Sequence, residues 1–289
     1  MTRDRRNILE ILAILLFLIY MIPFLIILIN ASKPSLKIID NPLSMPTDPS
    51  VFINNVVRTV TSPNVRYVSS FASSVIITVA SVGLIALITS MAAWVLVRTK
   101  TRLSGFLFMT FVAAMVIPFQ VVMFPLVSWL HLVEVKLGLM NTPFRLLQNY
   151  PGIILSYLGF GAPMSVFLFH GFIKGVPLEL EESATIDGCS RSGTFYQIVL
   201  PILKPITVTV IILNGIWIWN DFLLPMLILG SGNNVQTLPL AVANFVGSFL
   251  RKWDLILTAT IMAMLPVVIV FLALQKHIIK GIMEGSVKG

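Results

Sequence analysis

Apolar residues occur along this chain in long runs, and charged residues interrupt them only at wide intervals. A helix that crosses a lipid bilayer needs about 20 consecutive, mainly apolar residues. Five charge-free stretches reach that length, and a sixth run, from Pro205 to about Leu229, is interrupted only by Asp221. The pattern therefore predicts six membrane-spanning helices, at about residues 8–30, 67–97, 104–130, 152–173, 205–229 and 254–275.

The composition indicates the same class of protein. Hydrophobic residues make up 57% of the chain and charged residues only 11%, whereas soluble domains are about 25% charged. So much apolar surface excludes a single soluble core and intrinsic disorder, and one cysteine excludes a disulfide scaffold. With no internal repeat and no separate soluble segment, we predict an all-α membrane protein with one domain over residues 1–289.

The distribution of Lys and Arg predicts the orientation in the membrane. An even number of spans places both termini on one side, and that side receives twelve of the twenty Lys and Arg residues, including the tight clusters at residues 3–6 and 98–102. Cytoplasmic loops carry the excess of Lys and Arg, so we expect both termini and the loop at 175–204 to be cytoplasmic. This placement also explains the net charge of +8 without a nucleic-acid partner.

Three spans have features beyond their apolar character. The first has a basic start, but its apolar stretch is too long for a signal peptide and no A-x-A cleavage site follows, so we interpret it as an uncleaved anchor. The second is rich in Ser, Ala and Gly, which let helices approach closely within lipid. The third contains Pro118 and Pro125, which predict a kinked helix.

The loop between the fourth and fifth spans carries the most specific local signals. Pro177 suits a first helical position, acidic residues follow in the first turns, and Gly188 suits a left-handed helix stop. We therefore predict a helix over residues 177–187 and a second short helix from about Ser192 to Pro201. A helix this short is marginal alone, so it must dock either on its own membrane domain or on a partner.

The same loop contains a spaced motif. It reads Glu182-Ser183-Ala184, then three residues, Gly188, nine residues, and Ile198-Val199-Leu200-Pro201. This spacing resembles in full the E-A-A…G…I-x-L-P signature of permease subunits in binding-protein-dependent ATP-binding-cassette (ABC) importers. Ser183 stands where that family usually has Ala, which keeps a small residue at the position.

Four other segments are similar to the maltose-type, carbohydrate branch of that family. They are Asn141-Thr142-Pro143, Trp219-Asn220-Asp221-Phe222, Thr237-Leu238-Pro239 and the C-terminal segment 281–289. The resemblance implies a type I ABC importer permease architecture, with six transmembrane helices in the cytoplasmic (inner) membrane of a prokaryote. It also implies a second homologous permease subunit, two cytoplasmic ATPase subunits, an extracytoplasmic solute-binding protein and membrane lipid as partners.

In this family, the loop helix fits a groove on the ATPase and transmits the closure of the ATPase dimer to the spans. The resemblance implies that Glu182 contacts a basic ATPase residue and that Gly188 makes the turn between the two short helices. Segment 281–289 resembles family tails that reach the ATPase dimer. The residues implied to couple this chain to the ATPase are Glu181, Glu182, Ser183, Ala184, Asp187 and Gly188.

Motifs for catalysis within this chain are missing from the sequence. There is no G-x-x-x-x-G-K-[ST] phosphate loop, and no Ser–His–Asp set can be argued from the spacing. His131, His170 and His277 have no Cys, His or carboxylate at metal-ligand spacing. We therefore expect no catalytic residues, metal or cofactor in this chain, which would not be an enzyme; ATP and Mg would bind to the partner subunits.

Polar and aromatic residues inside spans are candidates for the substrate pathway, because polar groups there are costly and often functional. A sugar site needs an amide or carboxylate beside an aromatic face, and the fifth span offers both. The structural alternatives are an interfacial belt for Trp217 and a cap or bundle partner role for Asp221. The candidates are Gln120, Tyr157, Asn214, Trp217, Asn220 and Asp221.

The main hypothesis is a permease that forms half of the translocation pathway for a sugar or oligosaccharide. One alternative is an importer of another polar solute such as a glycerol phosphate. A phosphate would favour basic pore residues, whereas no Lys or Arg lies inside a predicted span. An ion-driven secondary transporter is a second alternative, although such proteins often show inverted repeats and intramembrane ion sites; a membrane enzyme is a third.

Overall fold

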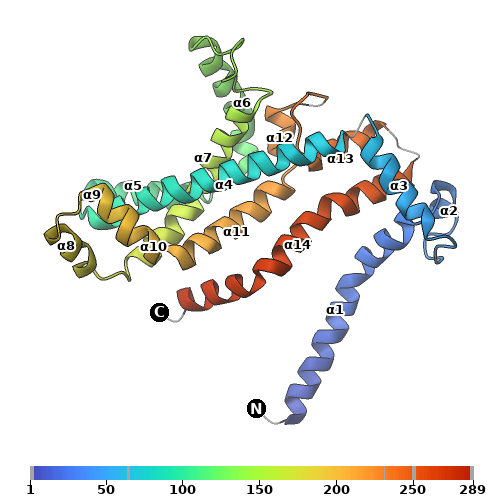
Figure 1. Cartoon of the computed structure of the whole chain (residues 1–289), viewed down its shortest axis with the longest axis horizontal. Helices are drawn as coiled ribbons and strands as arrows, with labels where there is room; N and C mark the ends of the chain where they lie inside the picture. Colours follow the sequence, from blue (N-terminus) through green and yellow to red (C-terminus); the bar gives the residue numbers. More distant parts are fainter. Residues whose placement is uncertain (1–2, 64–65, 231, 249–251, 287–289) are drawn as a thin grey trace. The chain divides into compact units, whose positions relative to one another are not determined.

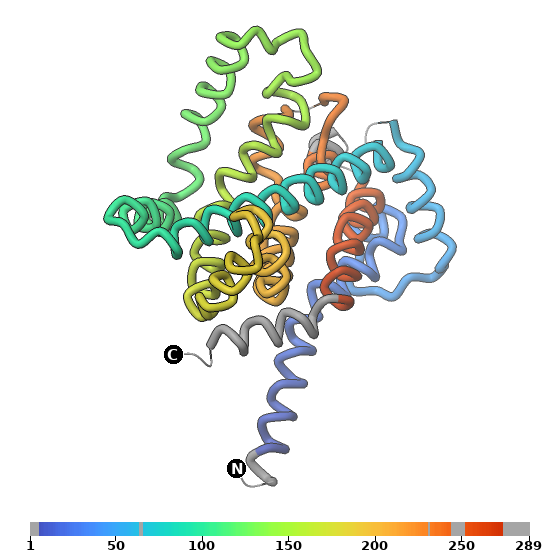
Figure 2. The backbone as a smooth tube through the Cα atoms, turned by 60° about the vertical axis from the view of Figure 1, so that its left-hand side comes forward, coloured from blue at the N-terminus to red at the C-terminus, as the bar shows by residue number. Residues whose placement is uncertain are grey.

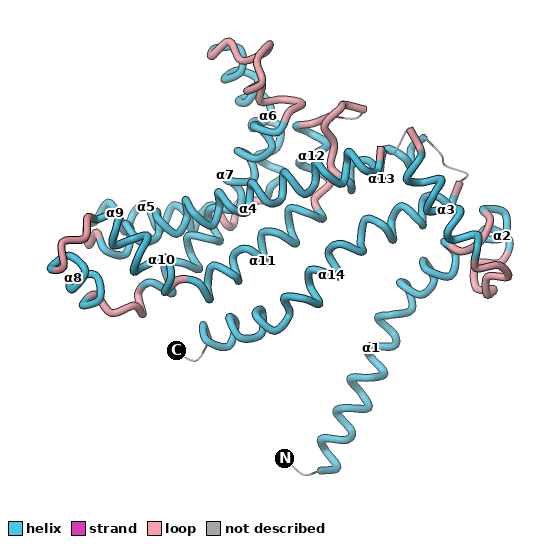
Figure 3. The backbone as a smooth tube through the Cα atoms, viewed as in Figure 1, coloured by secondary structure: helices cyan, strands magenta, loops and turns pink. Residues whose placement is uncertain are grey.

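The computed structural model describes residues 3–63, 66–230, 232–248 and 252–286. Over these residues the chain is built from helices joined by short loops, and no strand occurs (Figure 3). The predicted all-α class is therefore confirmed. The order of the helices along the chain is shown in Figure 1.

Contacts between Cα atoms group the chain into two compact units, which are described separately. The first unit contains Met1–Ser70 and Ala241–Pro266, and the second contains Phe71–Leu240 and Val267–Gly289. Two long helices contribute to both units: α4 (Tyr67–Arg98) and α14 (Trp253–Ser286). The single membrane domain expected over residues 1–289 stays a prediction.

The first unit is held together by polar contacts at one end of its helices. Its complete helices are α1 (Arg3–Ala31), α2 (Ser35–Asp40) and α3 (Ser50–Thr61). The buried Lys33 ammonium donates hydrogen bonds to Asn30 Oδ1 at 3.1 Å and to two backbone carbonyls, those of Asn41 and Pro42. Burial lowers the pKa of Lys33 below its ordinary value. The carboxylate of Asp254 accepts hydrogen bonds from Ser35 and Arg58, which ties α14 to α2 and α3.

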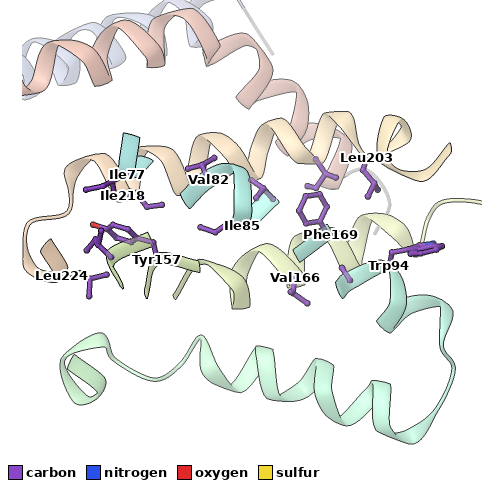
Figure 4. Packing of buried hydrophobic residues seen from close by; sticks show 14 of the residues in the cluster. Ile77, Val82, Ile85, Trp94, Tyr157, Val166, Phe169, Leu203, Ile218 and Leu224 are labelled. Carbon is purple, nitrogen blue, oxygen red and sulfur yellow. The ribbon is translucent and has the colours of Figure 1, made fainter. Parts of the chain in front are cut away.

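The second unit has a core whose buried side chains come mainly from α4, α7 (Tyr150–Ile173) and α11 (Lys204–Asn220). Figure 1 and Figure 2 show α7 crossing α4 obliquely. Tyr157 and Trp94 lie toward opposite ends of the row of buried side chains in Figure 4. The helices of this unit between the two long ones are α5 (Arg102–Ala114), α6 (Phe119–Lys136), α7 (Tyr150–Ile173), α8 (Glu179–Ile186), α9 (Arg191–Thr194), the π-helix η1 (Phe195–Val199), α10 (Leu200–Ile202), α11 (Lys204–Asn220) and α12 (Leu223–Ile228). Most of α13 (Leu238–Ser248) belongs to the first unit.

Five described helices are long and apolar enough to cross a membrane, and a bent pair brings the number to six. The pair is Arg191–Ile202 with Lys204–Asn220, which meet at 75°. This number agrees with the predicted six spans. The five long segments are Arg6–Ala31, Tyr67–Arg98, Phe119–Lys136, Tyr150–Ile173 and Trp253–Ala273.

Two predicted spans are interrupted in the structure. The third, expected over residues 104–130, is split into α5 and α6 by a break at 115–118, so a single kinked helix was wrong there. Pro118 occupies the N-cap of α6 in an extended conformation, where its missing N–H removes a bond that a continuous helix needs. The fifth, expected over 205–229, ends at Asn220, because Asp221 is extended and its Oδ1 accepts a hydrogen bond from Leu223 N at 3.0 Å. Such local side-chain bonds compete with helix continuation.

Candidate functional site

The loop at 175–204 folds into α8, a tight turn and α9. Helix α8 begins at Glu179, two residues later than predicted, with Leu178 as N-cap. The helix ends at Ile186, and the chain then turns at Gly188, whose backbone φ of +85° lies in the left-handed region. Cys189 N donates to Ala184 O at 2.9 Å and Gly188 N donates to Thr185 O at 3.1 Å, the hydrogen-bond pattern of a Schellman motif. Gly188 therefore makes the turn that the sequence predicted.

After the turn, a second series of short helices leads into the membrane. Ser190 caps α9 by accepting a hydrogen bond from Gly193 N at 3.1 Å. The residues of the Ile198–Pro201 part of the motif lie in η1 and α10. A sharp bend at Leu203 then separates them from α11. The second half of the motif thus forms the joint between the loop and the fifth span.

Helix α8 has a buried face and an exposed face. Glu181 and Ala184, three residues apart, are buried, as expected for side chains on the same side of a helix. Ile186 is 86% exposed, which is unusual for a large apolar side chain on a helix with a polar face. Ile186 was not in the predicted coupling set, whose exposed members are Glu182, Ser183, Asp187 and Gly188.

The buried face of α8 is fixed to the end of α4. Glu181 Oε2 accepts a hydrogen bond from Trp94 Nε1 at 2.9 Å, and Glu181 Oε1 accepts from Arg98 Nε at 2.9 Å. Arg98 also forms an ion pair with Glu181 at 2.8 Å and donates to the backbone carbonyl of Val176 at 3.0 Å. Among the predicted coupling residues, Glu181 therefore points toward its own membrane helices.

Sequence reasoning missed Trp94 and Arg98. Arg98 was used only for orientation, although its spacing of four residues from Trp94 places both side chains on one face of a helix. The signal that could have found them was the combination of a tryptophan and an arginine on one face at the predicted cytoplasmic end of a span. Their partner is 83 residues away from Arg98 in the sequence.

Three of the predicted pathway residues come together near the break between α11 and α12. The buried Tyr157 hydroxyl donates to Asp221 Oδ2 at 3.1 Å. The Tyr157 ring packs edge-on against Trp217, with ring centroids 5.5 Å apart. Asp221 also caps α12 through Leu223 N. The aspartate thus acts as a cap and bundle partner, one of the two roles considered from the sequence.

Trp217 also lines a cavity of about 740 Å³ between α5, α6 and α7. The polar groups among its lining side chains are the indole N–H groups of Trp129 and Trp217 and the hydroxyl of Ser156, which donates to Gly152 O at 2.7 Å. The lining therefore offers few free hydrogen-bonding groups, which suits an apolar occupant better than a sugar.

The remaining pathway candidates are three amides, and one of them, Asn220, directly precedes Asp221 in the sequence. Asn214 is buried and its Nδ2 donates to Ser165 Oγ at 3.0 Å and to Val210 O at 2.9 Å. Asn220 is exposed and donates to Ile216 O. Gln120 is exposed at the start of α6. The surroundings of the three amides differ, since Asn214 is buried and the other two are exposed.

Among the residues that the structure describes, no group of three or more His, Cys, Asp or Glu side chains lies close enough to hold a metal ion. The prediction of no metal and no cofactor stays a prediction. His277 and segment 281–289 lie outside the residues whose side chains are described.

Comparison with known proteins identifies similar chains over most of the sequence. Residues 85–284 match the family described as "Binding-protein-dependent transport system inner membrane component". The chain is 38% identical over 284 residues, covering 98% of it and 97% of the relative, to the probable starch degradation products transport system permease protein AmyC of Thermoanaerobacterium thermosulfurigenes. It is 38% identical to the melibiose/raffinose/stachyose import permease protein MelC of Bacillus subtilis, with 76% of each chain covered.

Two further similarities extend over nearly the whole chain. The multiple sugar-binding transport system permease protein MsmG of Streptococcus mutans is 32% identical, with 94% of this chain and 93% of the relative covered. A solved structure has the same fold, with a TM-score of 0.72 at 20% identity over 96% of this chain and 98% of the other. It is the crystal structure of a bacterial ABC transporter involved in the import of the acidic polysaccharide alginate.

Proposed function

Because this chain belongs to the family of binding-protein-dependent transport system inner membrane components, we propose that it is the permease subunit of an ABC importer for a sugar or oligosaccharide. It would form half of the translocation pathway beside a second homologous permease. Two cytoplasmic ATPase subunits would supply the energy, and an extracytoplasmic solute-binding protein would deliver the solute. The sugar class is supported by relatives named for starch degradation products and for melibiose, raffinose and stachyose.

The observation that carries the coupling proposal is the exposed face of α8. Glu182, Ser183, Ile186 and Asp187 are exposed on a helix that is fixed from behind. An apolar side chain beside carboxylates fits a groove on an ATPase subunit with an apolar floor and a basic rim. In this proposal Glu182 contacts the ATPase, whereas Ala184 and Gly188 shape the helix and its turn, and Glu181 supports the helix from behind.

The proposed orientation places both termini and this loop in the cytoplasm of a prokaryotic cell. Glu181 is bonded to Arg98, so α8 lies at the same end of α4 as the basic cluster at residues 98–102. That cluster marks the cytoplasmic side by the distribution of Lys and Arg. The location of α8 and the charge distribution thus support the same side for ATPase docking.

For the solute pathway, we propose that exposed residues make the contacts and buried ones hold the helices. Trp217 and Asn220 expose aromatic and amide groups, and Gln120 exposes a second amide from α6. Tyr157 and Asn214 have their polar groups engaged within the bundle. Asp221 would hold the end of the fifth span beside the pathway.

The experiment that tests the function is uptake by a reconstituted complex. The chain is purified with its co-purifying subunits, placed in proteoliposomes, and supplied with the binding protein, ATP and radiolabelled maltotriose or raffinose. The expected result is uptake that requires ATP and the binding protein. Uptake by the chain alone, driven by an ion gradient without ATP, would instead establish a secondary transporter.

Glu182→Lys tests the coupling face within the same assay. Loss of a charged contact costs about 1.5–3 kcal/mol, so uptake should fall about 10- to 100-fold. Glu179→Lys is the matched control, since Glu179 is exposed on the same helix outside the motif, and it should retain uptake within about twofold. Equal uptake by the Glu182→Lys complex and the unaltered complex would refute a coupling role for Glu182.

A further inference from the structure

Glu181 differs from the other acidic residues of α8 in where its carboxylate lies. Glu179 and Glu182 are exposed, whereas Glu181 is 7% exposed. A buried carboxylate is costly unless it is paired and hydrogen-bonded. Both of its oxygens have donors from α4, one from Trp94 and one from Arg98. The carboxylate is thus an attachment point between two helices that are far apart in the sequence.

The attachment fixes the start of α8 in more than one direction. Trp94 and Arg98 lie one helical turn apart on α4, so they hold the carboxylate from two levels of the same face. Arg98 also donates to Val176 O at 3.0 Å, just before α8 begins. Charge-assisted hydrogen bonds of this kind are stronger and more directional than neutral ones. Helix α8 is therefore restrained against both rotation and sliding along α4.

Trp94 also contacts the segment that follows Gly188. The guanidinium carbon of Arg191 lies 5.6 Å from the centre of the Trp94 ring, within cation–π range. The Phe195 ring packs against Trp94 with centroids 5.3 Å apart. The two arms of the loop, before and after Gly188, are thus both held on one tryptophan of α4.

The opposite part of α4 is bonded to other elements of the same unit. Ser73 and the Tyr150 hydroxyl at the start of α7 are hydrogen-bonded at 2.9 Å. Ser74 Oγ accepts a hydrogen bond from Leu238 N at 2.7 Å. Helix α4 has 32 residues, a length of about 48 Å at 1.5 Å per residue. Helix α4 is therefore unbroken and forms hydrogen bonds with other elements toward both of its ends.

We propose that Trp94 and Arg98 are positioning residues that lock the coupling helix to α4 through Glu181, so that α4 carries the movement of α8 across the membrane. The inference rests on the proposed function, because it assumes that an ATPase subunit moves α8. An eight-residue helix cannot transmit force unless it is fixed to a longer element, and the Trp94–Arg98–Glu181 cluster supplies that fixation. ATP hydrolysis and transport should become uncoupled when the cluster is broken.

The test compares solute moved per ATP hydrolysed in reconstituted complexes. Trp94→Phe keeps one aromatic ring and removes the N–H donor together with the second ring of the indole. Glu181→Gln keeps the shape and removes the charge. In both, the ATPase should still co-purify, while the transport-to-hydrolysis ratio should fall about tenfold, as for one lost charge-assisted hydrogen bond. Glu179→Gln is the matched control and should leave the ratio unchanged. The double variant Arg98→Glu/Glu181→Arg exchanges the two charges. Its transport-to-hydrolysis ratio should be higher than that of either single variant.

A spectroscopic measurement separates positioning from general loss of stability. Cys189 is the only cysteine, so Cys189→Ala allows nitroxide labels at Ser183→Cys on α8 and Ile88→Cys on α4, both exposed. In the full-length chain in detergent, Glu181→Gln should broaden the distribution of distances between the labels, and Glu179→Gln should not. An unchanged distribution and an unchanged ratio in Glu181→Gln would overturn the inference.

The two proposals fail in different ways. If Glu182→Lys abolishes transport while Glu181→Gln leaves the ratio intact, the coupling function stands and the role of Trp94 and Arg98 is wrong. If no ATPase co-purifies with the unaltered chain, the proposed function itself is wrong, and the positioning inference fails with it.

Discussion

Replacing Gly161 of α7 by alanine tests how closely α7 packs against α4 and α11. A Cβ atom at this position would lie 2.6 Å from Ile85 Cδ1 and 2.7 Å from Asn214 Oδ1. Ile85 is fully buried, and Asn214 is held by hydrogen bonds to Ser165 and Val210. Both atoms are the ends of buried side chains, so the added methyl group must push one or both side chains aside within a packed core and disturb the hydrogen bonds of Asn214.

The size of the effect follows from these two costs. Overpacking a core costs about 1–3 kcal/mol, and a disturbed buried hydrogen bond adds about 1 kcal/mol. We therefore expect Gly161→Ala to lower the free energy of unfolding by about 2–4 kcal/mol. Gly159 lies two residues earlier on α7, and a Cβ there would have no heavy atom within 4 Å. Gly159→Ala should be neutral or stabilising by up to about 1 kcal/mol, since alanine favours helix.

The assay is thermal unfolding of the purified chain in detergent, followed by the fraction that remains monodisperse on size exclusion. Gly161→Ala should unfold at a clearly lower temperature than Gly159→Ala. The double variant Gly161→Ala with Asn214→Ala should regain part of the loss, because it removes the atom that the methyl group would meet. Equal unfolding temperatures for the two glycine variants would refute the close approach of α7 and α11.

Two further stability predictions use buried charged groups. Arg145→Gln leaves the buried Glu134 carboxylate without the guanidinium 3.1 Å away, and because Arg145 is partly exposed the cost should be about 2 kcal/mol. Thermal unfolding measures this loss of stability. Adding Glu134→Gln should recover much of the lost stability, and an unchanged unfolding temperature in the double variant would contradict the cost assigned to the unpaired carboxylate. Lys33→Met removes the ammonium that binds two loop carbonyls and should cost about 1–3 kcal/mol, with faster chymotrypsin cleavage at residues 41–47. Lys136→Met, at an exposed lysine of the second unit, is the control and should cleave at the unaltered rate. Equal cleavage of both variants would exclude this role of Lys33.

The fold class and the number of spans could be predicted because they depend on composition over long windows. A run of about 20 apolar residues has few other uses in a folded chain. The interruptions could not be predicted in the same way. The break before Pro118 and the cap at Asp221 each involve one or two residues, and a window that averages over a span does not detect them. Proline indicated a kink, but tertiary packing decides whether a helix bends or stops.

In the loop at 175–204, some residues could be predicted from the sequence and others could not. Its helix stop at Gly188 depends on local backbone conformation, so a local pattern identified it. The buried side of α8 follows no such local pattern: the apolar Leu180 is 45% exposed, whereas the charged Glu181 is buried. From sequence alone, a glutamate is predicted to be on the surface, because it is seldom buried without a partner. Those partners are more than 80 residues away on α4.

Family membership also bears on how the polar residues of this chain are used. A permease component is not itself an enzyme, as predicted, so its polar residues need to hold helices or meet partners. Glu181, Tyr157 and Asn214 each bond to a residue on another element of their own unit. Glu182 and Ile186 are exposed instead. We therefore expect substitutions in the first group to change stability or the transport-to-hydrolysis ratio, and substitutions in the second group to change the binding of a partner. Binding of purified ATPase to detergent-solubilised variants from both groups would distinguish the two kinds of residue.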